Sequence, residues 1–494
     1  MNNQLKSIGL LFSGQVLIKS SNFLKQLLMA YFLGVSGRVD LLLVAQIIPN
    51  IIGSMISGGA GEILVTKTNV EDSSKQTFVT FFTFISTALI AIVLFLYWFF
   101  LPFVADKLDV SLSDQSLFTQ LSFLLIVSKI FGSIVSCLQH LLYAKNLYKK
   151  FIVVSLIAEL LGIIVILLFV KENHILAFAY GILVSTVATA ILFVTIHHLP
   201  LKPLFNIEEW KSNWDELKSM YRKIFTLSLQ TLMNHLSSFW ERMLSFKYLQ
   251  PGYLSALNYS KSLTELPKMA FLSSVLTTSY IEQNKRKEIS NEKYLSYSNK
   301  VDALLNETAF FFQILSLLLS PFVLIVLYQR GAFDSSDVRL TLFIYQILTL
   351  GFLPGLMFNF LTRTMFIESE MKHLFWLITC KSIFEIIGMT IFITTFYQTI
   401  PVILTISKYL SVFYLYYYLN KKKSGIFNTR KSVKLYMIAI VVSLLLYFLN
   451  QEVINAITDL SIFELGVYYS PVLLFSLILS FYFIRNIKKK IAVS

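Results

Sequence analysis

The chain has 494 residues, of which 56% are hydrophobic and only 14% are charged. This composition excludes an ordinary soluble protein, and because a spanning helix needs about 20 apolar residues, the length leaves room for roughly a dozen crossings and no large soluble domain. The formal net charge of +14 would also fit a nucleic-acid-binding protein, but the placement of the basic residues indicates membrane topology instead, so no nucleic-acid partner is expected.

Apolar runs separated by polar breaks predict an all-α polytopic membrane protein with fourteen transmembrane helices. In chain order the predicted helices cover residues 8–33, 40–66, 78–105, 117–143, 151–170, 174–198, 219–248, 253–280, 301–328, 338–366, 373–398, 400–420, 433–450 and 462–485. The first run is too long for a cleavable signal peptide and contains lysines.

Lysine and arginine accumulate in alternate loops. Twenty-seven of the 42 basic residues fall in the termini and loops that share a side with the N-terminus, and the opposite loops hold only Arg38, Lys107, Lys171 and Arg330. Since basic loops stay in the cytoplasm, both termini are predicted to be cytoplasmic. The basic runs at 421–423 and 488–490 are expected to contact anionic membrane lipids.

Several kinds of chemistry are excluded by the motifs that the sequence lacks. Cys137 and Cys380 lie far apart in apolar runs and the six histidines form no ligand cluster, so no disulfide or metal site is expected. The sequence has no glycine-rich nucleotide-binding motif and no predicted loop large enough for a catalytic domain. It therefore predicts a transporter rather than an enzyme, without a cofactor and driven by a monovalent cation gradient or the membrane potential.

A weak internal repeat relates the two halves of the chain. Residues 23–49 resemble residues 240–267, because each copy has a basic residue in a helix, then a glycine turn, then a proline in the next helix. Six predicted helices separate the copies, so they predict two parallel six-helix bundles, an arrangement typical of transporters. The predicted domains are an N-lobe (1–198), a cytoplasmic linker (199–223), a C-lobe (219–420), and a final helix pair with a basic tail (421–494).

Eleven basic residues fall inside predicted helices, where each needs an ion pair, a water-filled cavity or an interface. Two of them have a glutamate four residues further along the same helix: Lys261 precedes Glu265, and Lys381 precedes Glu385. This spacing places the two side chains on one face of a helix, where they can neutralise each other.

Lys25 has no acidic residue one turn away, so it either faces an aqueous cavity or pairs with an acid from another helix, such as Asp40 or Glu62. Lys19 likewise has no acidic residue one turn away. With the basic residues of the second repeat copy they predict a cationic chamber for an anionic ligand, and a diphosphate is a natural candidate. The basic residues of this chamber are Lys19, Lys25, Arg242 and Lys261.

The predicted helix 40–66 contains Pro49 and several glycines, including Gly53, Gly58 and Gly59. Such a helix bends or breaks where neighbours or water satisfy the freed backbone groups, or its small residues only allow close helix packing. These four residues, with Pro267 as the counterpart of Pro49 in the second copy, are the predicted conformational positions.

Residues 328–334 read YQRGAFD and are followed by Asp337, a close match to the R-G-A-F-D signature of the MurJ/MviN lipid II flippases of the MOP exporter superfamily. Supporting strings are residues 30–34 (AYFLG), 48–50 (IPN) and 256–260 (ALNYS). The resemblance implies a flippase of the bacterial inner membrane that moves an undecaprenyl-diphosphate-linked peptidoglycan precursor, lipid II, by alternating access. The final helix pair would hold the polyprenyl tail.

The resemblance also implies roles for single residues. The family's cavity arginines correspond to Lys19, Lys25 and Lys261, and its acidic residue at the start of the second helix corresponds to Asp40. Gly53 stands where the family has a basic residue, and the family's E-G-A string reads GGA at residues 58–60. Some members have a sodium site, and its remnants here would be Asn234 and Glu385.

These departures leave three alternatives to lipid II flipping. The first is a flippase for another lipid-linked oligosaccharide, such as an O-antigen, capsule or exopolysaccharide repeat unit. The second is a cation-coupled drug exporter of the MATE type, which usually has fewer helices and acidic cavity residues. The third is a non-transporting scaffold, in which Lys19, Lys25 and Lys261 would have to be paired and dry.

Overall fold

The structure is a computed structural model of the chain and describes residues 2–57, 73–144, 147–197, 204, 206–395, 399–422, 426–457, 464–465, 467–478 and 480. Within these ranges every long regular element is an α-helix, which confirms the predicted all-α class. The chain divides into two compact units, Met1–Ser255 and Ala256–Ser494.

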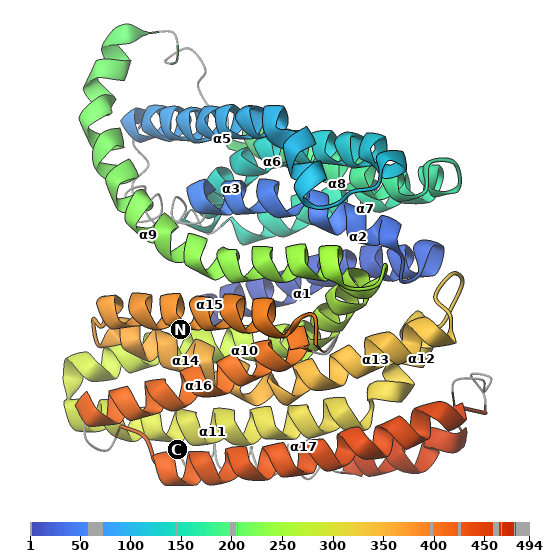
Figure 1. The fold of residues 1–494 in the computed structure, drawn as a ribbon. Coiled ribbons are helices and arrows are strands. Elements are labelled where there is room, and N and C mark those ends of the chain that lie inside the picture. Colours follow the sequence, from blue (N-terminus) through green and yellow to red (C-terminus); the bar gives the residue numbers. More distant parts are fainter. Residues whose placement is uncertain are drawn as a thin grey trace. The chain divides into compact units, whose positions relative to one another are not determined.

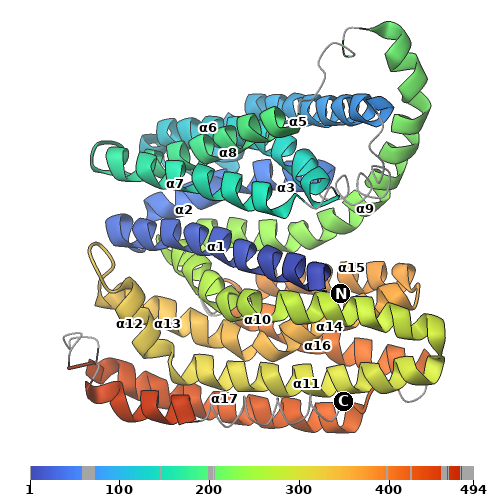
Figure 2. The ribbon, with the colours of Figure 1, turned by 180° about the vertical axis from the view of Figure 1, so that it is seen from behind.

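The first unit contains eight helices of the described chain (Figure 1). They are α1 (Asn2–Leu33), α2 (Gly37–Ala45), α3 (Ile47–Ser57), α5 (Ser73–Lys107), α6 (Leu112–Ala144), α7 (Tyr148–Asn173), α8 (Ile175–His197) and α9 (Ile207–Tyr248). Within this unit α7 and α8 pack along each other, and α1 packs on α7. Two views show α9 as a long curved helix (Figures 1 and 2).

The second unit follows from the first turn of α10 onward. Its described helices are α10 (Tyr253–Ile289), α11 (Asn291–Leu318), α12 (Ser320–Tyr328), α13 (Ser335–Leu350), α14 (Phe352–Ile367), α15 (Met371–Phe392), α16 (Thr399–Lys422), α17 (Thr429–Ile457) and a final helix Val467–Ile478. Here α11 lies along α17, and α16 packs against α13, α14 and α15 (Figures 1 and 2).

The described residues contain nine helices that are long and apolar enough to cross a membrane, or ten when the bent pair of α13 and α14 counts as one more span. This makes the chain a multi-pass membrane protein. The helices α9 and α10 are longer still, at 42 and 37 residues, but carry many charged residues. The figure of fourteen spans and the parallel repeat therefore stay predictions.

Three of the predicted helices are broken in the structure. The predicted helix 40–66 is interrupted at Gln46 between α2 and α3, three residues before Pro49, which falls in the first turn of α3, where its missing N–H costs least; α2 and α3 still form one apolar span, Gly37–Met55. The predicted helix 301–328 divides at Leu319, ahead of a proline in α12. The third divides at Gly351, where α13 and α14 meet at a bend of 44°.

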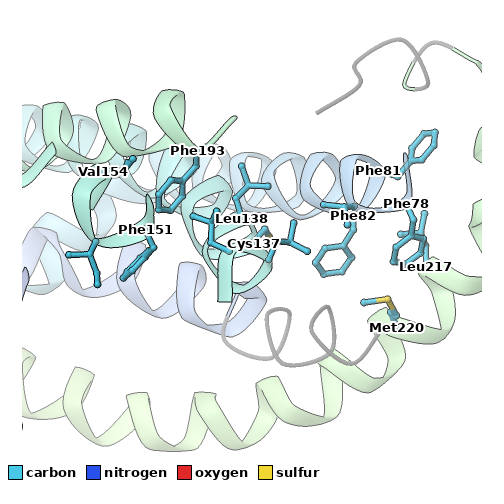
Figure 3. Packing of buried hydrophobic residues seen from close by; sticks show 14 residues of the cluster. Phe78, Phe81, Phe82, Cys137, Leu138, Phe151, Val154, Phe193, Leu217 and Met220 are labelled. Carbon is cyan, nitrogen blue, oxygen red and sulfur yellow. The ribbon is translucent and has the colours of Figure 1, made fainter. Parts of the chain in front are cut away.

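The core of the first unit is an aromatic and aliphatic cluster (Figure 3). Phe82 of α5, Leu138 of α6 and Phe193 of α8 are fully buried in it, and Leu217 and Met220 bring the first half of α9 into the same cluster. Burial of such side chains stabilises the fold by roughly 1.5 to 3 kcal/mol each. The first half of α9 is therefore part of the first unit.

This placement differs from the predicted division, in which residues 219–248 opened the C-lobe after a linker at 199–223. Hydropathy separates helices but does not show which bundle a helix packs against, and α9 packs on α2 and α3. Parts of the predicted linker, and the basic tail from residue 481 on, lie outside the described residues.

The R-G-A-F-D string forms the turn between α12 and α13. Gly331 has a φ of 64°, which favours glycine, and Phe333 is buried against the rings of Tyr259 and Tyr328 at centroid distances of 5.9 and 5.4 Å. Asp334 caps α13 by accepting hydrogen bonds from the Ser336 side chain and backbone, and these bonds hold the pKa of its carboxyl below the usual value. The motif thus has a structural explanation in this chain.

Candidate functional site

A cavity of about 460 Å³ opens between α3, α6 and α9 of the first unit. Its charged lining residues are Lys129 and Arg242, with His235 beside them, and its described lining includes no acidic side chain. We call it the cationic cavity. Because a charge inside a membrane protein needs a partner or water, two cations in one cavity without an acid suit an anionic ligand.

Lys129 projects from α6 into this cavity. No ion pair or hydrogen bond joins it to another described residue, so its ammonium has three donors for a ligand. Gly53 of α3 lies beside it: a Cβ at position 53 would be in van der Waals contact with Cδ of Lys129, at 3.5 Å. A larger side chain there would meet the lysine.

Arg242 projects from the second half of α9, which packs against α2 and α3. Its Nη1 donates to the carbonyl oxygen of Leu43 at 3.5 Å, which orients the side chain. A guanidinium has five N–H donors in a fixed fork, so this single bond leaves capacity for the oxygens of a phosphate.

A second cavity has a volume of about 400 Å³ and is lined mainly by residues of α6, α7 and α8, together with Gln46 between α2 and α3. It shares three lining residues with the first cavity, namely Asn50, Lys129 and Gly132. Apart from Lys129, its described lining has one charged residue, Glu159. Since Glu159 is neutralised by a lysine, we call this the neutral cavity. Both cavities belong to the first unit.

Lys25 forms an ion pair with Glu159 of α7, and its Nζ also donates to Ser185 Oγ of α8 at 3.4 Å. Gly162 allows α7 and α8 to approach closely here, since a Cβ there would lie 2.6 Å from the carbonyl oxygen of Gly181, and it would also lie 3.2 Å from Nζ of Lys25. Lys25 thus takes the second of its two predicted environments, an acid from another helix, but the partner is neither Asp40 nor Glu62. Glu62 lies outside the described residues.

Asp40 is buried at 2% exposure and lines neither cavity. Its Oδ2 accepts the backbone N–H of Gly252 at 2.7 Å, and its Oδ1 accepts that of Ser255 at 2.6 Å. Gly252 has a φ of 95°, so the turn after α9 depends on both glycine and this carboxylate. The contacts favour a structural role for Asp40 over substrate contact.

Lys19 has an exposed side chain on α1 and lines neither cavity. Lys261 belongs to the second unit, on α10, where the nearby Glu265 pairs with Lys268 at 2.5 Å. Of the five predicted substrate-binding residues, the structure therefore places one, Arg242, in the cationic cavity.

The predicted ion-coupling carboxylate, Glu385 of α15, is 2% exposed. It pairs with Lys381 at 2.6 Å, as the i,i+4 spacing predicts, and accepts a hydrogen bond from Ser407 of α16. A lysine ammonium thus occupies the place on this carboxylate that a bound cation would take. The side chain of its predicted companion Asn234 lies outside the described residues.

Among the predicted conformational positions, Pro49 lies in the first turn of α3 and Gly53 lines the cationic cavity. The helix is interrupted at Gln46, but α2 and α3 continue as one apolar span, Gly37–Met55. Pro267 lies within α10, which runs through it without a matching break. Gly58 and Gly59 lie outside the described residues.

Three titratable residues of these cavities were missing from the predicted site: Lys129, Glu159 and His235. Two of them carry a signal in the sequence. Lys129 is one of eleven basic residues inside predicted helices and has no acid one turn away, and Glu159 is the single acid in the apolar run 151–170. A lone acid and lone lysines in neighbouring helices indicate pairing, but not which lysine pairs. No group of three metal-binding side chains occurs among the described residues.

Comparisons with known proteins give one family and a set of related folds. A protein-family model described as "Lipid II flippase MurJ" matches residues 29–468. No curated protein matches the chain. The solved structure "Lipid II flippase MurJ, inward closed conformation" has a TM-score of 0.74 at 20% identity, covering 97% of this chain and 99% of that one.

Two further structures are transporters of the MOP superfamily. An inward-facing multidrug resistance MATE family transporter has a TM-score of 0.63 at 11% identity, covering 84% of this chain and 96% of its own. A MOP superfamily transporter from Pyrococcus furiosus has a TM-score of 0.57 at 12% identity, covering 92% and 97%. At such identities these likenesses show a shared fold alone.

Proposed function

The chain belongs to the lipid II flippase MurJ family, whose members are transporters rather than enzymes, and we propose that it flips undecaprenyl-diphosphate-linked peptidoglycan precursor, lipid II, across the bacterial inner membrane. The observation that carries this proposal is the cationic cavity, which Lys129 and Arg242 line and whose described lining has no acidic residue. A diphosphate is the anionic part of such a lipid. Two basic side chains in one cavity suit its negative oxygens.

The proposed cycle is alternating access, without covalent chemistry. The cavity binds the diphosphate when it is open to the cytoplasm, closes, and opens to the outer face. In this proposal the helix bends at the interruption at Gln46, and Gly53, which lines the cationic cavity, eases that bending. In this proposal two six-helix lobes move relative to each other, both termini are cytoplasmic, and the final helix pair holds the polyprenyl tail.

The membrane potential can set the direction of transport. An elementary charge that crosses the membrane gains or loses about 2.3 kcal/mol per 100 mV. Because the inside is negative, outward movement of a diphosphate is favourable. Coupling to a monovalent cation through Glu385 would require the ammonium of Lys381 to leave that carboxylate.

A second cargo is favoured by one observation, the absence of a side chain at Gly53, where the resemblance implies a basic residue. The cavity therefore lacks one basic side chain that the resemblance implies. A different glycan on the same diphosphate carrier would suit such a change. This alternative is a flippase for an O-antigen, capsule or exopolysaccharide repeat unit.

Complementation of a bacterium depleted of its own lipid II flippase tests the proposal. The wild-type chain should restore growth, and Arg242→Ala should not, because removing a guanidinium that binds phosphate costs roughly 1.5 to 3 kcal/mol of binding. Arg242→Lys keeps the charge and loses the fork, so partial rescue is expected. Lys171→Ala, at an exposed end of α7, is the matched control and should rescue fully.

Membrane levels of each variant are measured by immunoblot. Full rescue by Arg242→Ala at normal levels would show that the cationic cavity does not bind the substrate. If the wild-type chain fails in this strain but restores a strain that lacks its flippase for a surface polysaccharide, the cargo is the alternative glycan.

A further inference from the structure

The neutral cavity has a wall of uncharged hydrogen-bonding groups. The amides come from Gln46, Asn50 and Gln139, and the hydroxyls come from Ser155, Thr186 and Thr189. The volume, about 400 Å³, lies within the range of small-molecule sites. The two threonines already bond within the protein, whereas within the described part of the chain the side-chain amides of Gln46 and Asn50 make no hydrogen bond and are available to a ligand.

The charge of this wall differs from that of the cationic cavity. Glu159 is the acidic lining residue, and its ion pair with Lys25 makes the pair neutral. Lys129, which the two cavities share, is the remaining cation of the described lining. The neutral cavity therefore offers hydrogen bonds to an uncharged polar ligand. At its border with the cationic cavity, Lys129 can bind a negatively charged group of the same ligand.

The threonines of α8 are oriented to accept hydrogen bonds. Thr186 Oγ1 donates its hydrogen to the carbonyl oxygen of Ile182 at 2.8 Å, and Thr189 Oγ1 donates to that of Ser185 at 2.7 Å. Thr186 Oγ1 also accepts a hydrogen bond from Ser128 Oγ at 3.1 Å, so it keeps one lone pair for a further donor, and the Thr189 hydroxyl oxygen can accept as well. Sugar hydroxyls are donors, and a ligand dense in hydroxyls matches a wall of this kind.

We propose that the neutral cavity is a carbohydrate subsite, which takes the first sugar of the lipid-linked substrate while the adjoining diphosphate lies in the cationic cavity. Lys129 stands at the border of the two and contacts the phosphate next to the sugar. This inference rests on the proposed function and adds to it the orientation of the head group within the first unit.

The test compares two lipids that differ only in the sugar. Purified protein is titrated with undecaprenyl diphosphate and with undecaprenyl diphosphate carrying N-acetylglucosamine, an uncharged sugar, and binding is followed by native mass spectrometry. The variant Thr186→Val/Thr189→Val removes two hydroxyls at nearly constant shape. It should bind the sugar-bearing lipid about tenfold more weakly and the sugar-free lipid as well as wild type does, since each hydrogen bond accounts for roughly a threefold effect.

Thr195→Val is the matched control, because Thr195 lies on the same helix, makes the same bond to a backbone carbonyl, and is exposed outside both cavities. Equal weakening of both lipids by the double variant, or no weakening of either, would overturn the carbohydrate subsite. Failure of the wild-type chain to bind either lipid, or binding of both that Arg242→Ala leaves unchanged, would instead overturn the proposed function.

Discussion

Replacing Lys25 with alanine should destabilise the first unit by about 3 to 5 kcal/mol, because it leaves Glu159 as an uncompensated charge among apolar helices. The Lys25 and Glu159 side chains are only 11% and 19% exposed, so solvent screens the lost interaction weakly. Glu159→Gln alone should be destabilising for the corresponding reason. Thermal unfolding of the purified protein in detergent measures both effects.

The double variant Lys25→Ala/Glu159→Gln distinguishes a structural role from a transport role. Without a charge of either sign, it should recover most of the stability lost by Lys25→Ala. If the pair only holds α1 to α7, the double variant also restores growth in the complementation strain. Lys150→Ala, at an exposed position near the start of α7, controls for the loss of a lysine. Normal stability of Lys25→Ala would show that the ion pair contributes little.

Asp40→Ala should have the second largest effect, a loss of about 2 to 5 kcal/mol. It removes both acceptors of the buried N–H groups of Gly252 and Ser255, and each unsatisfied buried donor costs roughly 1 to 3 kcal/mol. Asp40→Asn keeps one oxygen and should lose less.

The melting temperature and the amount of folded protein recovered from the membrane report this loss. Asp114→Ala is the control, because Asp114 accepts a hydrogen bond from Ser111 at an exposed position. Asp40→Ala with wild-type stability, together with a selective loss of lipid binding, would mean that Asp40 contacts the substrate instead.

Much of the fold could be predicted because hydropathy reports directly on membrane burial. The apolar runs at 78–105, 117–143, 151–170 and 174–198 each became one helix of the first unit. Helix breaks were harder to locate. The prolines and glycines indicated a break in the helix 40–66, but the same signal at Pro267 produced none in α10, since tertiary packing decides whether a proline interrupts a helix.

The site could be predicted only in kind. A buried lysine without an acid one turn away indicated a cation that needs an acid from another helix or a ligand. Lys25 indeed pairs with an acid of another helix, whereas Lys381 pairs with Glu385 on its own helix. Whether Lys25 meets an acid or a ligand depends on Glu159, which lies 134 residues further along the chain on another helix. No spacing rule connects such residues. For the same reason Lys129 did not stand out among the eleven basic residues inside predicted helices.

The central claim is that Lys129 and Arg242 bind a diphosphate in the cationic cavity. The most direct measurement is the affinity of the purified protein for undecaprenyl diphosphate, compared with uncharged undecaprenol. Lys129→Ala should weaken binding of the diphosphate lipid about tenfold or more, Lys129→Arg should retain most of it, and undecaprenol should bind all three proteins equally. Unchanged affinity of Lys129→Ala for the diphosphate lipid would contradict the claim.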